Sequence, residues 1–153
     1  LSYQNIYGAT FSGFELSQQW RLSEKLESKW IINWSDNRDE NNNPIPNTIP
    51  FSVSSYFNIN FLNNRFQSSI NTKWVAPYKP QEFDVRTATY ILSEEKINGY
   101  ALINIRTTFK IKKSINLSLV LDNLGNYTND NFRPFIGRAA YLEFSTALIT
   151  KDR

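Results

Sequence analysis

Residues 51–61 read Phe51-Ser-Val-Ser-Ser-Tyr-Phe-Asn-Ile-Asn-Phe61. Large apolar side chains occupy most of the odd positions, and serine or asparagine occupies most of the even ones. Successive side chains of a β-strand point to opposite faces of the sheet, so this stretch predicts a strand with one apolar and one polar face. We expect the odd-numbered residues from Phe51 to Phe61 to face outward, away from the polar side.

The same period-two alternation recurs along the chain, and helical periodicity is weak everywhere. The other alternating stretches are residues 14–22, 30–34, 66–74, 103–111, 115–121 and 140–148. They predict an all-β fold of about seven antiparallel strands. Most of these stretches can extend to the roughly nine residues that a tilted strand needs to cross a bilayer.

Short and long connections alternate between the predicted strands. The short ones are Ser23–Leu26, Asn63–Asn64 and Lys112–Ser114, and the long ones are Asp36–Pro50, Ala76–Asn98 and Gly125–Gly137. The long ones are rich in Asn, Pro and Gly, which favour turns and solvent. Outer-membrane β-barrels have short periplasmic turns and long extracellular loops, so this alternation favours transmembrane strands.

The composition excludes several function classes. Cys and His are absent, which removes thiolate metal sites, disulfides and the commonest general base. The net charge is +3, but Lys and Arg are scattered, so we expect no nucleic-acid partner. The acidic pairs lie in predicted loops beside basic residues and read as solvated charge. We therefore predict no enzyme activity, no catalytic residues, no metal site and no cofactor.

Aromatic residues favour a membrane barrel over a soluble β-sandwich, which has the same alternation. They fall near the strand ends, in two groups that would form belts at the two membrane interfaces. The group at the short-turn ends is Trp20, Trp30, Phe61, Phe66 and Phe109, and the group at the long-loop ends is Trp34, Phe51 and Trp74.

The chain cannot close a barrel by itself if it has about seven strands, because bacterial single-chain barrels have an even number, eight or more. An open sheet in lipid would also leave unpaired backbone groups. We therefore expect the first and last strands to pair with strands absent from this sequence. The chain begins at Leu1 and contains no Met, which indicates a processed chain or a piece of a longer one.

Several motifs resemble the C-terminal end of TonB-dependent receptors. Ser12-Gly-Phe-Glu-Leu16 is similar to the family's "G-hydrophobic-E-hydrophobic" strand, and Leu117-Ser-Leu-Val-Leu-Asp-Asn-Leu-Gly-Asn-Tyr127 resembles its "hydrophobic-x-N-L-x-N-x-Y" signature. Gly137-Arg-Ala-Ala-Tyr-Leu-Glu-Phe144 resembles its "G-R-x-hydrophobic" final strand. The family usually stops on a terminal aromatic residue, whereas this chain ends with Leu148–Arg153.

The resemblance implies that residues 1–153 are the C-terminal segment of an outer-membrane barrel of about 22 strands. The plug domain and the earlier strands would lie on the same or a separate chain. The implied function is active import of a scarce nutrient, in the first place an iron–siderophore complex. The TonB complex would supply the energy for this import. The partners would be that complex, the plug, the remaining strands, outer-membrane lipid and the iron chelate. The alternatives are a soluble β-sandwich binding module, or an outer-membrane barrel used as an adhesin or passive pore.

Ligand contacts, if the chain has them, are expected on the long loops. Aromatic rings and arginines there could stack on and attract an anionic, partly aromatic ferric chelate. The candidate ligand-binding residues are Tyr78, Phe83, Arg86, Tyr90, Tyr127, Phe132 and Arg133. Alternatively, these residues form a rim of aromatic and charged groups at the membrane interface and bind no ligand.

Overall fold

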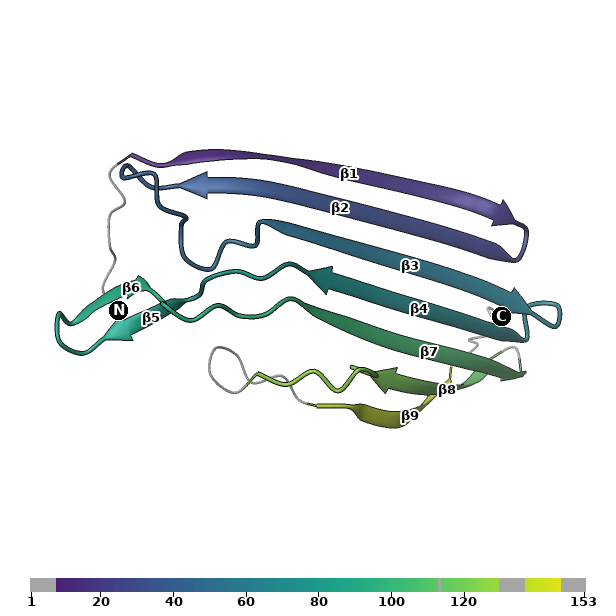
Figure 1. The fold of residues 1–153 in the computed structure, drawn as a ribbon. Coiled ribbons are helices and arrows are strands. Elements are labelled where there is room, and N and C mark those ends of the chain that lie inside the picture. Colours follow the sequence, from purple (N-terminus) through teal and green to yellow (C-terminus); the bar gives the residue numbers. More distant parts are fainter. Residues whose placement is uncertain (1–7, 113, 130–136, 147–153) are drawn as a thin grey trace, which may run out of the picture. The chain divides into compact units, whose positions relative to one another are not determined.

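The computed structural model describes residues 8–112, 114–129 and 137–146 (Figure 1). The strands are β1 (Thr10–Ser23), β2 (Leu26–Arg38), β3 (Phe51–Phe61), β4 (Phe66–Val75), β5 (Gln81–Asp84), β6 (Thr89–Leu92), β7 (Tyr100–Lys112), β8 (Ile115–Asp122) and β9 (Ala139–Thr146). In the described part of the chain, no helix is long and apolar enough to cross a membrane.

Seven of the strands form one sheet in the order β1-β2-β3-β4-β7-β8-β9 (Figure 1). The strands of this sheet therefore lie side by side in their order along the chain, and their number agrees with the predicted seven. Strands β7 and β8 pair antiparallel with Ile105 opposite Leu121, and β8 and β9 pair antiparallel with Leu119 opposite Leu142. Strands β1 and β9 are the two edges of the sheet and do not pair with each other.

Strands β5 and β6 form a separate two-stranded sheet inside the connection 76–99, which we had expected to be a long loop. Their four-residue length is too short to produce a clear period-two signal. The turn between them is held by the Asp84 side chain, which accepts hydrogen bonds from the Arg86 N–H at 2.9 Å and the Thr87 hydroxyl at 3.0 Å. The described part of the last strand runs to Thr146, and Leu148, where the predicted strand ends, lies outside the described residues.

The chain divides into two compact units. The first comprises residues 1–16, 31–53 and 74–100, and the second comprises residues 17–30, 54–73 and 101–153. The first unit contains the long connections 39–50 and 76–99, and the second contains the tight turns and the connection 123–138.

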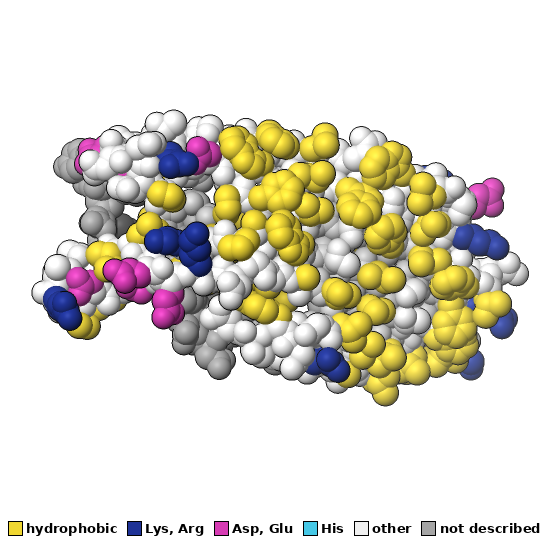
Figure 2. Space-filling model, in the orientation of Figure 1, with side chains coloured by type: hydrophobic (Ala, Val, Ile, Leu, Met, Phe, Trp, Pro, Cys, Tyr) yellow, Lys and Arg dark blue, Asp and Glu magenta, His cyan; other side chains and the backbone are white. Residues whose placement is uncertain are grey.

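The apolar side chains form an exposed face instead of a core. Figure 2 shows hydrophobic side chains gathered over the strands. Among the described residues, the buried apolar ones are Val75, Pro80, Ile97 and Val120, whereas Leu142 is 70% exposed and Phe144 62%. A β-sandwich would bury such residues against a second sheet. The exposure therefore fits lipid contact and does not fit the soluble sandwich.

Rings on neighbouring strands contact each other on this face. In the first unit, Phe14 stacks on Trp34 with ring centroids 5.9 Å apart, and Phe51 meets Trp74 edge-on at 5.8 Å. In the second unit, Trp30 meets Phe57 edge-on at 5.7 Å, and Phe66 stacks on Phe109 at 4.6 Å. These pairs fix the register of the strands through direct cross-strand contacts.

One polar residue interrupts the apolar face of β3. Ser55 stands at an odd position, between Val53 and Phe57, and is only 7% exposed. Its hydroxyl lies 2.6 Å from the hydroxyl of Thr72 on β4, which stands on the face of Trp74. One hydroxyl donates to the other in a single hydrogen bond, and this lowers the cost of placing polar groups on an apolar surface.

The opposite face is polar and carries its own network. Arg106 on β7 donates a hydrogen bond to Glu143 on β9 at 2.6 Å, and the Tyr141 hydroxyl donates to Asp122 at 3.3 Å. Thr108 and Ser118 pair their hydroxyls at 2.8 Å across β7 and β8. In a barrel these groups would line the lumen.

Candidate functional site

Asn47 joins the connections 39–50 and 76–99 through two hydrogen bonds. Its backbone N–H donates to the Lys79 carbonyl at 3.1 Å, and its side-chain oxygen accepts the Gln81 N–H at 3.2 Å. Asn47 adopts a φ of 62°, a left-handed conformation that asparagine tolerates better than most residues. The two connections are therefore held side by side within the first unit.

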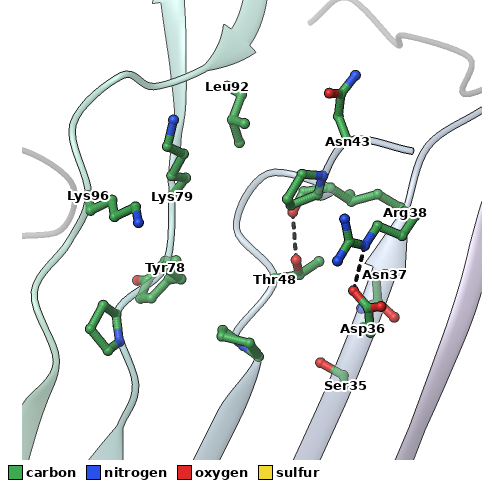
Figure 3. A pocket seen from close by; sticks show the side chains of 14 residues that line it. Ser35, Asp36, Asn37, Arg38, Asn43, Thr48, Tyr78, Lys79, Leu92 and Lys96 are labelled. Carbon is green, nitrogen blue, oxygen red and sulfur yellow. Dashed lines mark hydrogen bonds and ion pairs between the residues drawn. The ribbon is translucent and has the colours of Figure 1, made fainter. Parts of the chain in front are cut away.

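A pocket of about 470 Å³ lies between these two connections (Figure 3). Figure 3 shows Tyr78, Lys79 and Lys96 on one side of it, and Arg38, Asp36 and Thr48 on the other. Apolar groups also contribute to its wall, among them Pro44, Pro77 and Leu92. The pocket thus combines a partly apolar wall with three cationic side chains.

The three cations of the pocket differ in their partners. Arg38 is held in place, since its Nε donates to Asp36 at 2.6 Å and one of its terminal nitrogens donates to the Asn42 carbonyl at 3.1 Å. Within the described residues, neither Lys79 nor Lys96 forms an ion pair with a carboxylate. The lining therefore carries three positive charges and one negative charge, and it suits an anionic group.

An aromatic pair lies on the β5–β6 hairpin. Phe83 stands directly opposite Tyr90, with ring centroids 5.2 Å apart and ring planes at 65°. Phe83 is 52% exposed and Tyr90 45%, so the pair offers ring surface to solvent. Arg86 lies exposed in the turn that joins the two strands. Leu92, two residues after Tyr90 on the same strand, lines the pocket.

The structure thus brings together four of the seven residues that we had singled out from the sequence. Tyr78 lines the pocket, and Phe83, Arg86 and Tyr90 belong to the adjoining hairpin. Tyr127 belongs to the second unit, where its backbone N–H and carbonyl both bond to the Asn123 side chain, at 2.9 and 2.7 Å. Phe132 and Arg133 lie outside the described residues.

Sequence reasoning missed the three cations of the pocket. Arg38, Lys79 and Lys96 were part of the scattered charge, because they are far apart in the sequence and each has acidic or polar neighbours. The available signal was their position at the ends of two predicted long loops. No group of three or more His, Cys, Asp or Glu side chains that could hold a metal ion occurs in the described ranges.

Comparison with known proteins identifies the family. A family model described as "TonB dependent receptor-like, beta-barrel" matches residues 1–124. This match spans most of the chain, so the chain belongs to the TonB-dependent receptor β-barrel family, a family of outer-membrane proteins. A search of curated protein sequences gave no match.

Solved structures with the same fold include receptors and a transporter. A Pseudomonas aeruginosa FpvA bound to a ferric pyoverdine is 16% identical, with a TM-score of 0.73 over 90% of this chain and 19% of that one. The siderophore receptor PirA from Acinetobacter baumannii is 15% identical, with a TM-score of 0.74 over 90% of this chain and 22% of that one. The copper transporter OprC is 15% identical, with a TM-score of 0.72 over 90% and 23%.

The chain spans about a fifth of the length of the FpvA and PirA chains that it matches. At these identities the likeness shows the fold alone. The family and the fold together confirm the predicted all-β, antiparallel strands of an outer-membrane β-barrel.

Proposed function

We propose that residues 1–153 form the C-terminal segment of a barrel that imports a scarce nutrient, most of all an iron–siderophore complex, with energy from the TonB system. Family membership is the observation that carries this proposal. The edge positions of β1 and β9 support pairing with further barrel strands, because an unpaired edge is costly in lipid. Plug, TonB complex and lipid would be the partners.

The cargo proposal rests on the chemistry of the loops and on the neighbours. FpvA is described with a ferric pyoverdine and PirA as a siderophore receptor, whereas OprC is described as a copper transporter. The exposed Phe83–Tyr90 pair, with Arg86 beside it, supplies stacking surface and positive charge. A ferric chelate with aromatic, anionic donor groups uses both, whereas a bare copper ion would use neither.

We propose Tyr78, Phe83, Arg86, Tyr90 and Tyr127 as cargo-contacting residues. Phe132 and Arg133, which lie outside the described residues, complete the proposed set. Of these seven, the hairpin residues Phe83, Arg86 and Tyr90 form the element that can be removed most cleanly, because they belong to a sheet of their own.

The test is to truncate the hairpin in the intact receptor. Glu82 and Ile91 stand opposite each other, so residues 83–90 can be replaced by Asn-Gly, which closes a two-residue hairpin turn. We expect normal abundance in the outer membrane and slower growth on the native ferric chelate under iron limitation. The control is a full-length receptor with Glu94 and Glu95 changed to Gln, which alters the same connection and keeps the ring pair.

Undiminished growth of the truncated variant at normal abundance would show that cargo is captured elsewhere in the receptor. Growth that is independent of TonB in the wild type would instead argue for a passive pore.

A further inference from the structure

The three cations of the pocket, Arg38, Lys79 and Lys96, lie on the apolar, lipid-facing side of the sheet. For the two lysines, this follows from the backbone hydrogen bonds around Pro77. The Ala76 N–H bonds to Phe51 on the β3 side, at 2.9 Å, whereas Tyr78 exchanges two backbone bonds with Ile97 on the other side, at 3.2 and 2.9 Å. In a regular strand, residues two apart bond to the same neighbour and point to the same face. The alternation is therefore shifted at Pro77, a residue without an N–H.

This shift reverses the faces beyond Pro77. Tyr78 points away from the face of Phe51 and Trp74, and Lys79 points to that face. The Lys79 carbonyl supports this assignment, because it bonds to Asn47 on the β3 side, as the Ala76 N–H bonds to Phe51. Lys96 is opposite Lys79 in the antiparallel register that the Tyr78–Ile97 bridge sets, so the two ammonium groups share a face.

Arg38 reaches the same face from the other side of the pocket. Strand β2 runs unbroken to Arg38, so Trp34, Asp36 and Arg38 alternate onto one face. Trp34 stacks on Phe14, and Phe51 meets Trp74, so these are the ring pairs of the seven-stranded sheet that lie nearest the long connections in the first unit. The three cations lie directly beyond these rings, towards the long loops.

That position is the level of the lipid headgroups, since aromatic belts of membrane proteins mark the interface. With the long loops extracellular, as the family membership implies, the headgroups are those of the outer leaflet. Two lysines opposite each other with no carboxylate partner repel, and a bound anion relieves that repulsion. The Pro44, Pro77 and Leu92 wall adds apolar contact beside the charge.

We propose that this pocket binds a phosphate group of the phosphorylated glycolipid of the outer leaflet, held by Lys79, Lys96 and Arg38. The occupant is a membrane lipid and not the imported cargo, because the lysines face the lipid side of the sheet and the lumen lies behind it. Binding there anchors the connections 39–50 and 76–99, which Asn47 joins, to the membrane surface. The proposal rests on the outer-membrane placement and is independent of which nutrient is imported.

The experiment is native mass spectrometry of the intact receptor in detergent, titrated with diphosphorylated lipid A. The variants are K79Q/K96Q, the charge-preserving K79R/K96R, and the control K110Q/K112Q. Lys110 and Lys112 are exposed and end β7 at the short-turn end, so the control removes the same charge at the opposite membrane surface. Dephosphorylated lipid A, phosphatidylglycerol and inorganic phosphate are the comparison ligands, and heat-modifiable migration on gels verifies folding.

We expect the wild type to bind diphosphorylated lipid A more tightly than the comparison ligands. At about 1 kcal/mol per cation near a charged surface, K79Q/K96Q should bind it roughly 10- to 30-fold more weakly. K79R/K96R and K110Q/K112Q should bind like the wild type. Equal affinity of K79Q/K96Q and wild type, or an equal loss in K110Q/K112Q, would overturn the proposal.

Import of the ferric chelate, measured on the same variants, tests the lipid proposal separately from the proposed function. K79Q/K96Q should import the chelate at the wild-type rate, and the hairpin truncation should bind lipid A normally. Displacement of lipid A by the chelate would overturn the lipid assignment and make the pocket part of the cargo site.

Discussion

Phe83 and Tyr90 stand directly opposite each other across the β5–β6 hairpin, with ring centroids 5.2 Å apart and about half of each side chain exposed. Both rings are therefore accessible to a ligand that stacks on them. The pair's position on a hairpin that forms a sheet of its own makes it the most direct test of the cargo site.

Replacing both rings should weaken cargo binding and leave the barrel intact. For F83A/Y90A we expect the dissociation constant of the ferric chelate to rise about five- to tenfold, since an aromatic contact contributes roughly 1 kcal/mol. Binding can be measured by tryptophan fluorescence quenching on the purified receptor. The matched control is V85A/I91A, which removes two exposed apolar side chains of the same hairpin without touching a ring. Equal weakening in both variants would mean that the hairpin fold, and not the rings, matters.

Charge should be rejected on the apolar face and tolerated on the polar one. Leu119 is 44% exposed and stands mid-strand on β8, so Leu119→Arg would place a cation in lipid at a cost of about 2–4 kcal/mol. The same loss is expected for Ile105→Arg on β7. Asn116→Arg, on the polar face of β8, should cost much less.

Asn104→Arg is the weaker of the two polar-face controls. The Asn104 side-chain oxygen accepts the Asn123 N–H at 2.8 Å, so its replacement breaks a short hydrogen bond, whereas the Asn116 side chain donates only a longer bond, of 3.4 Å, to the Ser145 hydroxyl. Outer-membrane abundance of the intact receptor is the readout for all of these variants. Similar losses for Leu119→Arg and Asn116→Arg would contradict the assignment of the two faces.

Gly13 should be irreplaceable for a steric reason. A Cβ at this position would lie 2.6 Å from the Trp34 carbonyl oxygen and 3.3 Å from the Ser35 Cα, so the backbone of β1 or β2 would have to move. We expect Gly13→Ala to lower the temperature at which the folded barrel loses its heat-modifiable migration. Ser17→Ala, on the exposed continuation of β1, should leave that temperature unchanged. An unchanged temperature for Gly13→Ala would show that the two strands lie further apart than here.

Asn123 should stabilise the turn after β8 in two separable ways. It is 7% exposed, has a φ of 49°, and its amide group bonds to both the backbone N–H and the carbonyl of Tyr127. Asn123→Ala loses both bonds and strains the left-handed backbone, with an expected cost of about 2–3 kcal/mol. Asn123→Gly loses the bonds without the strain and should cost less. The same heat-modifiability measurement ranks the two, and an equal cost would assign the effect to the hydrogen bonds alone.

The faces of the strands and the order of the sheet were readable from the sequence. The Phe51–Phe61 alternation, and its recurrence between alternately short and long connections, depends only on the local two-residue period of a strand. Even the interruption at Ser55 did not hide the pattern, although only the pairing with Thr72 explains why a hydroxyl is tolerated there. Tyr78, Phe83, Arg86 and Tyr90 were found by residue type and loop position.

Tertiary structure alone decided the rest. The four-residue strands β5 and β6 carry too little periodicity to be recognised, and they form because Asp84 holds the turn between them. Lys79 and Lys96 share a face because the Tyr78–Ile97 bridge sets them opposite each other, and the shift at Pro77 turns Lys79 to the face of Trp74. Arg38 lies across the pocket from them because Asn47 holds the two connections together. Such a cluster depends on which backbone groups bond across distant parts of the chain, and a one-dimensional pattern does not contain those pairings. The sequence by itself determined a membrane-facing sheet, whereas the folded connections determined where its charges meet.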